Sequence, residues 1–204
     1  MTRSSSTKRP RAIPARRGSV RIIAGKWRRR RLRVEDRPDL RPTPDRVRET
    51  LFSWLAPVIQ GSRCLDLFAG SGALGFEAAS RGAKHVTMVE VDPELAGSLE
   101  KHRVLLSATE VTVVQDDAFR WLAATDAEFD IIFLDPPFAT YDVGVICAAL
   151  ENKGLVAPSG FVYLEHSAKA SVPRLPKNWE WYRSQRAGQL RYDLALRDSP
   201  GEIA

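Results

Sequence analysis

The spacing of apolar and polar residues divides the chain into three regions. Residues 1–19 show no regular apolar spacing and are rich in Arg, Ser and Pro, which is typical of a flexible basic arm. Two short strands around a turn are predicted next, from the segment Val20-Arg21-Ile22-Ile23, the following Gly25 and a basic run that ends at Val34. This pattern predicts a basic β-hairpin extension over residues 20–40, followed by a single domain over residues 41–204.

The domain over residues 41–204 alternates helical and apolar strand patterns. Thr43, Pro44 and Asp45 occur in the order of an N-cap, a first helical residue and a first-turn acid, so they predict a helix start. The apolar residues that follow have helical spacing: Val47, Leu51, Trp54, Leu55 and Val58.

Beyond Gly61, five apolar strands are separated by four helices. The predicted strands are Cys64–Phe68, His85–Glu90, Val111–Gln115, Asp130–Leu134 and Phe161–Glu165. The predicted helices are Ala73–Arg81, Pro93–Leu106, Ala118–Ala124 and Tyr141–Leu150. Apolar strands that alternate with helices indicate a parallel sheet covered on both faces. Trp179–Arg186 and Leu190–Arg197 predict a C-terminal antiparallel hairpin, which completes a mostly parallel seven-stranded α/β sheet.

Composition excludes several classes of protein. With 204 residues, 44% of them hydrophobic, the chain is long and apolar enough for a proper core. No apolar run approaches the roughly 20 residues that span a bilayer. The two cysteines, Cys64 and Cys147, are too few for a disulfide framework and read as core residues. We therefore expect a cytoplasmic protein.

Charge is distributed unevenly along the chain. Residues 1–34 contain 13 Lys and Arg and no acid, whereas the rest of the chain contains 18 Lys and Arg and all 25 Asp and Glu. A basic extension on an acidic body is typical of a protein that binds nucleic acid or another anionic surface. The alternative is a solvated tail.

A glycine-rich loop between a strand and a helix marks a candidate cofactor site. Gly70-Ser71-Gly72-Ala73-Leu74-Gly75 fits G-x-G-x-x-G, and Glu90 lies 18 residues after Gly72. Taken alone, this spacing also fits a dinucleotide site. Asp66, however, would repel a pyrophosphate at this position, whereas it would attract the sulfonium and ammonium groups of S-adenosylmethionine.

The acids around this loop suit the remaining parts of S-adenosylmethionine. Glu90 would accept hydrogen bonds from the ribose hydroxyls, and the Asp116-Asp117-Ala118 segment would receive the adenine amino group at the carboxyl edge of the sheet. The candidate cofactor residues are Asp66, Phe68, Ala69, Gly70, Gly72, Glu90, Asp117 and Ala118.

Asp135-Pro136-Pro137-Phe138 follows the fourth strand and is the candidate catalytic motif. The prolines stiffen the backbone, so the Asp135 carboxylate and the Pro136 carbonyl would accept both hydrogens of an exocyclic amine. Phe138 would stack on an extruded base, which is worth about 1–3 kcal/mol. This arrangement suits methylation of an aromatic amine, because the acceptors stabilise charge that develops on the nitrogen.

Other chemistries find less support. Methylation of a pyrimidine carbon would need a cysteine nucleophile in the site. His85, His102 and His166 are isolated, so no metal site is predicted. For His166, at the end of the fifth strand, a substrate contact and ordinary strand-end polarity both stay open.

The motifs together resemble the RsmD family of bacterial ribosomal RNA methyltransferases. The matching segments are Arg21–Trp27, Arg41–Glu49, Leu65–Gly75 and Phe133–Phe138, and similarity extends over about residues 20–198. The segment that starts Arg41-Pro42-Thr43 is the specific signal, since the glycine loop and Asp-Pro-Pro-Phe occur in many amino-methyltransferases.

The resemblance implies a Rossmann-like class I fold and transfer of a methyl group from S-adenosylmethionine to the N2 amine of guanine 966 in 16S ribosomal RNA. It further implies action on an assembling small subunit, and we expect the protein to be a monomer. The candidate RNA-binding residues are Arg21, Lys26, Arg28, Arg29, Arg30, Arg31, Arg41, Arg46 and Arg48, some of which would instead brace the cofactor pocket. The alternatives are an N6-adenine or other exocyclic-amine methyltransferase and a non-catalytic RNA-binding assembly factor.

Overall fold

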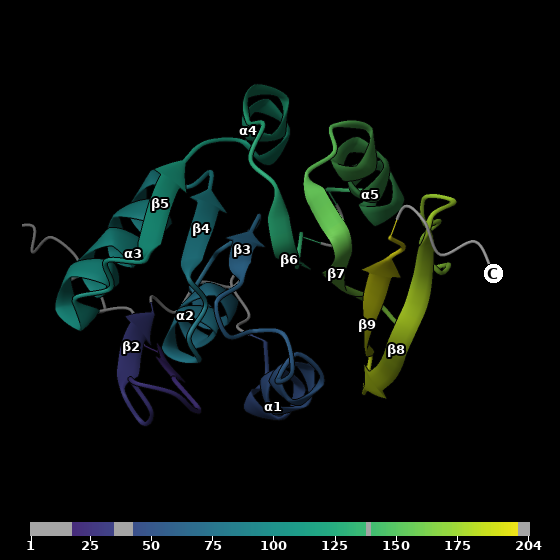
Figure 1. The fold of residues 1–204 in the computed structure, drawn as a ribbon. Coiled ribbons are helices and arrows are strands. Elements are labelled where there is room, and N and C mark those ends of the chain that lie inside the picture. The colour runs from purple at the N-terminus through teal and green to yellow at the C-terminus, as the bar shows by residue number, and fades with distance from the viewer. Residues whose placement is uncertain (1–17, 35–42, 138–139, 200–204) are drawn as a thin grey trace, which may run out of the picture.

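The computed structural model describes residues 18–34, 43–137 and 140–199 (Figure 1). The helices are α1 (Asp45–Trp54), α2 (Ala73–Ser80), α3 (Pro93–Leu106), α4 (Ala118–Ala124) and α5 (Val143–Asn152). The strands are β1 (Gly18–Arg21), β2 (Arg31–Val34), β3 (Arg63–Asp66), β4 (His85–Glu90), β5 (Val111–Gln115), β6 (Phe129–Leu134), β7 (Val156–Ser167), β8 (Trp179–Ala187) and β9 (Leu190–Arg197).

The main sheet has seven strands in the order β5-β4-β3-β6-β7-β9-β8. β5, β4, β3, β6 and β7 are parallel, whereas β9 is antiparallel to both β7 and β8. This topology confirms the predicted α/β sheet with a C-terminal antiparallel hairpin. The chain returns to the middle of the sheet after β5, so β3 and β6 become neighbours and their carboxyl ends share one edge, where ligands bind in such folds.

Each strand in the sheet's centre has apolar side chains on both faces. In β6, Ile131 and Phe133 belong to one core cluster, and Ile132 and Leu134 belong to the other. α1, α2 and α3 supply helix residues to the first cluster, and α4 and α5 supply them to the second. The result is a three-layer molecule, as the near-continuous apolar strands predict.

The N-terminal hairpin β1–β2 packs on the side of the sheet that carries α2 (Figure 1). In β2, Leu32 and Val34 are buried while Arg31 and Arg33 are exposed, which is the period-two pattern of a half-buried strand. Leu32 lies in the main core cluster, and Val34 packs with Ala73 at the start of α2. The hairpin therefore shares the core of the domain that contains the main sheet.

Some boundaries differ from the sequence expectation. β1 begins at Gly18, so Gly18 and Ser19 belong to the hairpin rather than to the arm; residues 1–17 lie outside the described residues. β7 starts five residues before the expected Phe161, and α5 begins at Val143 because the Asp142 side chain caps it. Both cysteines are buried and unpaired, as expected. Within the described ranges, no helix is long and apolar enough to cross a membrane.

Candidate active site

Four acidic side chains gather where β3, β4, β6 and β7 end. Asp66 and Glu90 occupy the last positions of β3 and β4, and Asp135 directly follows β6. In β7, Glu165 directly follows Leu164, which pairs with the last residue of β6. The sheet topology therefore places carboxyl groups from four separate sequence segments along one edge.

The glycine loop is held by hydrogen bonds to two of these acids. The Asp66 carboxylate accepts the Gly75 N–H at 3.0 Å, and the Glu90 carboxylate accepts the Gly70 N–H at 2.7 Å. Gly72 has a φ of +77°, and a Cβ there would come within 2.7 Å of Phe76 and Leu99 side-chain atoms. Only glycine fits this turn without strain, because φ is positive and the side chains of α2 and α3 leave no room for a Cβ.

Burial raises the pKa values of three of the acids. The pKa of Asp66 rises to about 7, mainly by burial and further through Asp135 and Glu90. Burial raises the pKa of Asp135 to about 6, while a hydrogen bond with Thr43 acts in the opposite direction. The pKa of Glu165 rises to about 8 through burial and the nearby Asp135. Within residues 18–34, 43–137 and 140–199, no Lys or Arg forms an ion pair with these three carboxyl groups.

This acidic environment fits a cationic cofactor. Buried carboxylates without a positive partner are costly, and a bound cation lowers their pKa values and offsets that cost. S-adenosylmethionine carries both a sulfonium and an ammonium group, whereas a dinucleotide pyrophosphate would add negative charge beside Asp66. The residues present therefore fit S-adenosylmethionine, with Asp66, Gly70 and Glu90 as the groups that would hold it.

An aromatic cluster lies close to two acidic side chains, Glu90 and Asp117. The Tyr141 ring is 5.1 Å from the Phe68 ring and 5.9 Å from the Phe119 ring, measured between centroids. Burial and the neighbouring Asp117 carboxylate raise the pKa of Tyr141. Asp117 itself caps α4 by accepting the N–H groups of the second and third helical residues. Apolar ring faces beside a fixed carboxylate offer an adenine base both stacking and a hydrogen-bond acceptor.

A cavity of about 680 Å³ opens on the side of Pro136. Its other walls come from the start of α5, the end of β7 and the segment Ala170–Arg174. Pro136 is buried and lines the cavity, while the adjacent Asp135 lies close enough to Asp66 to raise the pKa of Asp66. Phe138, the third predicted catalytic residue, lies outside the described residues.

The chain matches a family model described as "Conserved hypothetical protein 95" over residues 20–195. It is 45% identical to "Ribosomal RNA small subunit methyltransferase D" of Escherichia coli, covering 91% of this chain and 93% of the relative. A relative with the same description in Haemophilus influenzae is 42% identical, and the match covers 89% of this chain and 95% of the relative. The chain belongs to this family.

A solved structure of the family confirms the architecture. "Putative methyltransferase yhhF from Escherichia coli" superposes with a TM-score of 0.83 at 43% identity, covering 89% of this chain and 99% of that one. The sequence resemblance to the RsmD family is therefore confirmed, together with its Rossmann-like class I methyltransferase fold.

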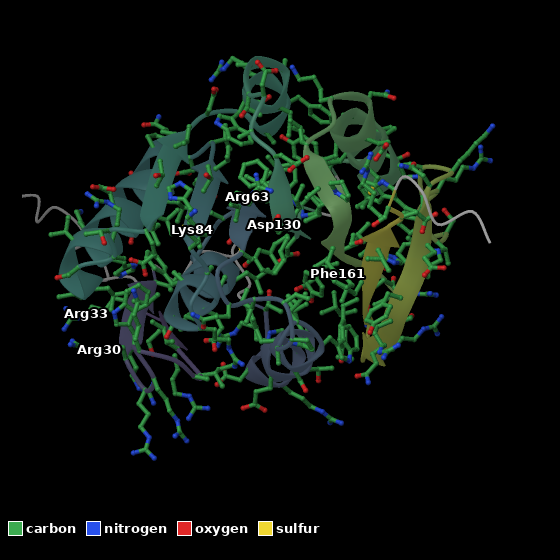
Figure 2. All side chains as sticks on the ribbon, viewed as in Figure 1. Arg30, Arg33, Arg63, Lys84, Asp130 and Phe161 are labelled. Atoms are coloured by element: carbon green, nitrogen blue, oxygen red, sulfur yellow. The ribbon has the colours of Figure 1, made fainter. Side chains whose placement is uncertain are left out.

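The basic residues of this family member fall into two groups. Arg28, Arg29 and Arg30 form the exposed hairpin turn, and Figure 2 shows Arg30 and Arg33 pointing away from the body of the protein. Arg46 is also exposed. Among the other predicted RNA contacts, Arg21 pairs with Asp45, Lys26 pairs with Glu110, and Arg31 donates to Ser19, yet all three remain exposed. Arg41 lies outside the described residues.

Arg48 is not a surface residue, so its assignment to RNA binding is wrong. Its side chain is 1% exposed and lies 3.7 Å from the Glu77 carboxylate, measured from Nη1 to Oε2. Its Nη2 donates to the Arg21 carbonyl and to Asp45. The guanidinium thus connects α1 to the hairpin and to α2. A buried arginine needs acidic partners from its own fold, and here they are provided within the protein.

Thr43 is not the N-cap of α1, because Pro44 occupies that position and no side chain caps the helix. The Thr43 hydroxyl oxygen instead lies 2.9 Å from a Glu165 carboxyl oxygen and 3.4 Å from an Asp135 carboxyl oxygen. Sequence reasoning missed this role and that of Tyr163, whose hydroxyl donates to Glu165 at 2.8 Å. The available signal was the position of Thr43 inside the segment that distinguishes the family.

Proposed function

We propose that the chain transfers a methyl group from S-adenosylmethionine to the exocyclic N2 amine of a guanine in small-subunit ribosomal RNA. The observation that carries this proposal is that Asp135 belongs to a cluster of buried acids at the carboxyl edge of the sheet, while the adjacent Pro136 lines a cavity of about 680 Å³. The family relationship supports the ribosomal RNA substrate, because the relatives are described as small-subunit methyltransferases. By resemblance, the target is guanine 966 of 16S ribosomal RNA.

The residues around Asp135 suit an amine that is a weak nucleophile. When bound, S-adenosylmethionine supplies an electrophilic methyl group. The Asp135 carboxylate and the Pro136 carbonyl would hold the two amine hydrogens, and they would stabilise the positive charge that develops on nitrogen during transfer. Pro136 and Pro137 fix the backbone, so these acceptors are in place before the base arrives.

The cavity beside Pro136 would receive the extruded nucleoside. Its volume of about 680 Å³ exceeds that of a single base, which leaves room for the ribose and part of a neighbouring nucleotide. Arg174 lies in its wall and would neutralise a phosphate, and Phe138 would stack on the base. On the hairpin, Arg28, Arg29 and Arg30 would contact phosphates farther from the target.

The biological setting follows from the substrate. We propose that the enzyme works in the cytoplasm on an assembling small subunit, where the RNA around the target is already folded. The exposed large apolar side chains in the described part of the chain are scattered, for example Val58, Val104 and Trp181, which is typical of a monomer. Residues 1–19 would act as a basic arm that adds phosphate contacts.

The test compares methyl transfer with cofactor binding in Asp135→Ala. The substrate is the small ribosomal subunit from a strain that lacks this enzyme, assayed beside naked 16S RNA. We expect the variant to lose transfer while its calorimetric affinity for S-adenosylmethionine stays within about threefold of the original, because the carboxylate faces the amine. An equal loss of cofactor affinity, or a methylated adenine as the product, would contradict the proposal.

A further inference from the structure

A buried chain of hydrogen bonds ends on the proposed catalytic carboxylate. The Tyr163 hydroxyl lies 2.8 Å from Glu165 Oε1, and the Thr43 hydroxyl lies 2.9 Å from the same oxygen. The Thr43 hydroxyl also lies 3.4 Å from Asp135 Oδ2. Thr43, Tyr163 and Glu165 are all buried, at 5%, 0% and 3% exposure. These hydrogen bonds therefore link Tyr163 to Glu165, Glu165 to Thr43, and Thr43 to Asp135.

We propose that Thr43 is a positioning residue, whose hydroxyl orients the Asp135 carboxylate towards the target amine while Glu165 holds a proton. With that proton on Oε1, Glu165 accepts the Tyr163 hydroxyl and donates to Thr43, and Thr43 donates to Asp135. Every hydroxyl hydrogen then has an acceptor, and Asp135 carries the negative charge. The proposal rests on the proposed function, which assigns Asp135 to the amine.

The electrostatic surroundings favour this placement of the proton. The titratable groups that face Glu165 are Asp66 on β3, Asp135 after β6 and Tyr163 on β7. Tyr192 on β9 lies behind Tyr163, with ring centroids 6.5 Å apart. Two carboxylates this close in a buried site do not both ionise readily. Glu165 is 3% exposed, whereas Asp135 is only partly buried, so the proton is assigned to Glu165, the more deeply buried carboxyl group of the pair.

Thr43 lies just ahead of α1 and takes no part in capping it. Pro44 is the N-cap residue and has no side-chain acceptor, so α1 starts without a side-chain cap. The Thr43 hydroxyl instead contacts Glu165, which lies 122 residues away in sequence. The start of α1 is thus attached to the end of β7 at the catalytic motif.

The experiment uses Thr43→Val, which keeps the side-chain shape and removes the hydroxyl, with Thr43→Ser as the rescue variant. The control is Thr50→Val in α1, where the lost hydroxyl donates to the Arg46 carbonyl. We expect Thr43→Val to lower kcat by about ten- to a hundredfold, as for loss of one hydrogen bond to a charged group. KM for the subunit and Kd for the cofactor stay within twofold, and Thr43→Ser returns kcat to within threefold.

The pH profile separates positioning from general destabilisation. Because the Thr43 hydroxyl lowers the pKa of Asp135, its loss moves the acid limb of kcat to higher pH, and Thr43→Ser moves it back. A kcat for Thr43→Val within threefold of the original overturns the proposal. So does a loss of kcat with an unmoved acid limb, or one that Thr43→Ser fails to rescue.

Glu165→Gln tests where the proton resides. Glutamine is neutral at every pH, as a protonated glutamate is, so we expect this variant to lower kcat at neutral pH by less than Asp135→Ala does. A fall to the level of Asp135→Ala overturns the assignment of the proton to Glu165. Asp135→Ala is assayed alongside: if it stays active, the proposed amine site is wrong, whereas an inactive Asp135→Ala with a normal Thr43→Val rejects the positioning role alone.

Discussion

Replacing Glu77 by Gln tests how the hairpin is attached to the catalytic domain. Glu77 lies in α2 and is fully buried. Its carboxylate accepts the backbone N–H of Ile23 at 2.7 Å and that of Ala24 at 3.0 Å, each on a different oxygen. It also accepts Arg81 Nε at 2.7 Å and faces the buried guanidinium of Arg48. One side chain therefore joins the hairpin, α1 and α2.

The expected loss of stability follows from these contacts. Glutamine keeps only one acceptor oxygen and points an amide N–H₂ at a backbone N–H. Leaving a buried donor without an acceptor costs about 1–3 kcal/mol. Arg48 loses its buried acidic partner, and breaking a buried ion pair from one side typically costs about 3–5 kcal/mol in total. Because Arg48 keeps Asp45 at 2.6 Å, we expect the lower end, about 3 kcal/mol.

The assay is urea unfolding followed by circular dichroism, together with hydrogen exchange of the Ile23 and Ala24 amides. The control is Glu128→Gln, which removes a half-exposed ion pair with Arg63 at the opposite end of β3 and should cost less than about 1 kcal/mol. Figure 2 shows Arg63 and Asp130 side by side there. If Glu77→Gln costs no more than the control and the two amides stay protected, Glu77 does not anchor the hairpin.

Three further predictions concern the cofactor site and the hairpin. The pKa of Asp66 is about 7, and a bound cationic cofactor lowers it, so binding at pH 7 should release about half a proton and should tighten as pH rises. Calorimetry in buffers of different ionisation enthalpy measures the proton release, and an affinity that does not change with pH would contradict this prediction. Replacing Arg28, Arg29 and Arg30 together by alanine should reduce the slope of log affinity against log salt concentration by about 2–3. Filter binding to small subunits measures this slope, and an unchanged slope would mean that these arginines do not contact the RNA. Gly25→Ala should destabilise the protein by about 2 kcal/mol or more, because φ is +80° and a Cβ would lie 1.8 Å from the Ser80 carbonyl. Gly97→Ala meets nothing within 4 Å, so it should raise stability by about 0.5–1 kcal/mol and is the matched control for unfolding.

The sheet was predictable because the packing on its two faces depends on local sequence pattern. Continuous apolar segments such as Ile131–Leu134 are needed where helices cover both faces, and Asp92 caps α3 through neighbouring backbone N–H groups. The position of Asp66 before the glycine loop also depends only on chain order. These features do not require knowledge of distant contacts.

The roles of Thr43 and Arg48 were not predictable in the same way. Both occur in a segment whose local pattern fits a capped helix with basic residues on its surface. Their partners, Glu165 and Glu77, come from elements far away in sequence. Contacts with these distant residues, rather than the local sequence pattern, therefore decide both roles. The fold could thus be predicted from local periodicity, whereas part of the site depends on contacts between residues that are far apart in sequence.

The proposed function stands or falls with the identity of the methylated atom. Nucleoside mass spectrometry of small-subunit ribosomal RNA, from a strain with and without this protein, identifies that atom. We expect one N2-methylguanine to be absent without the protein, and to return with the original chain but not with Asp135→Ala. Loss of a methyladenine instead, or no change in any methylated nucleoside, would refute methylation of the guanine amine.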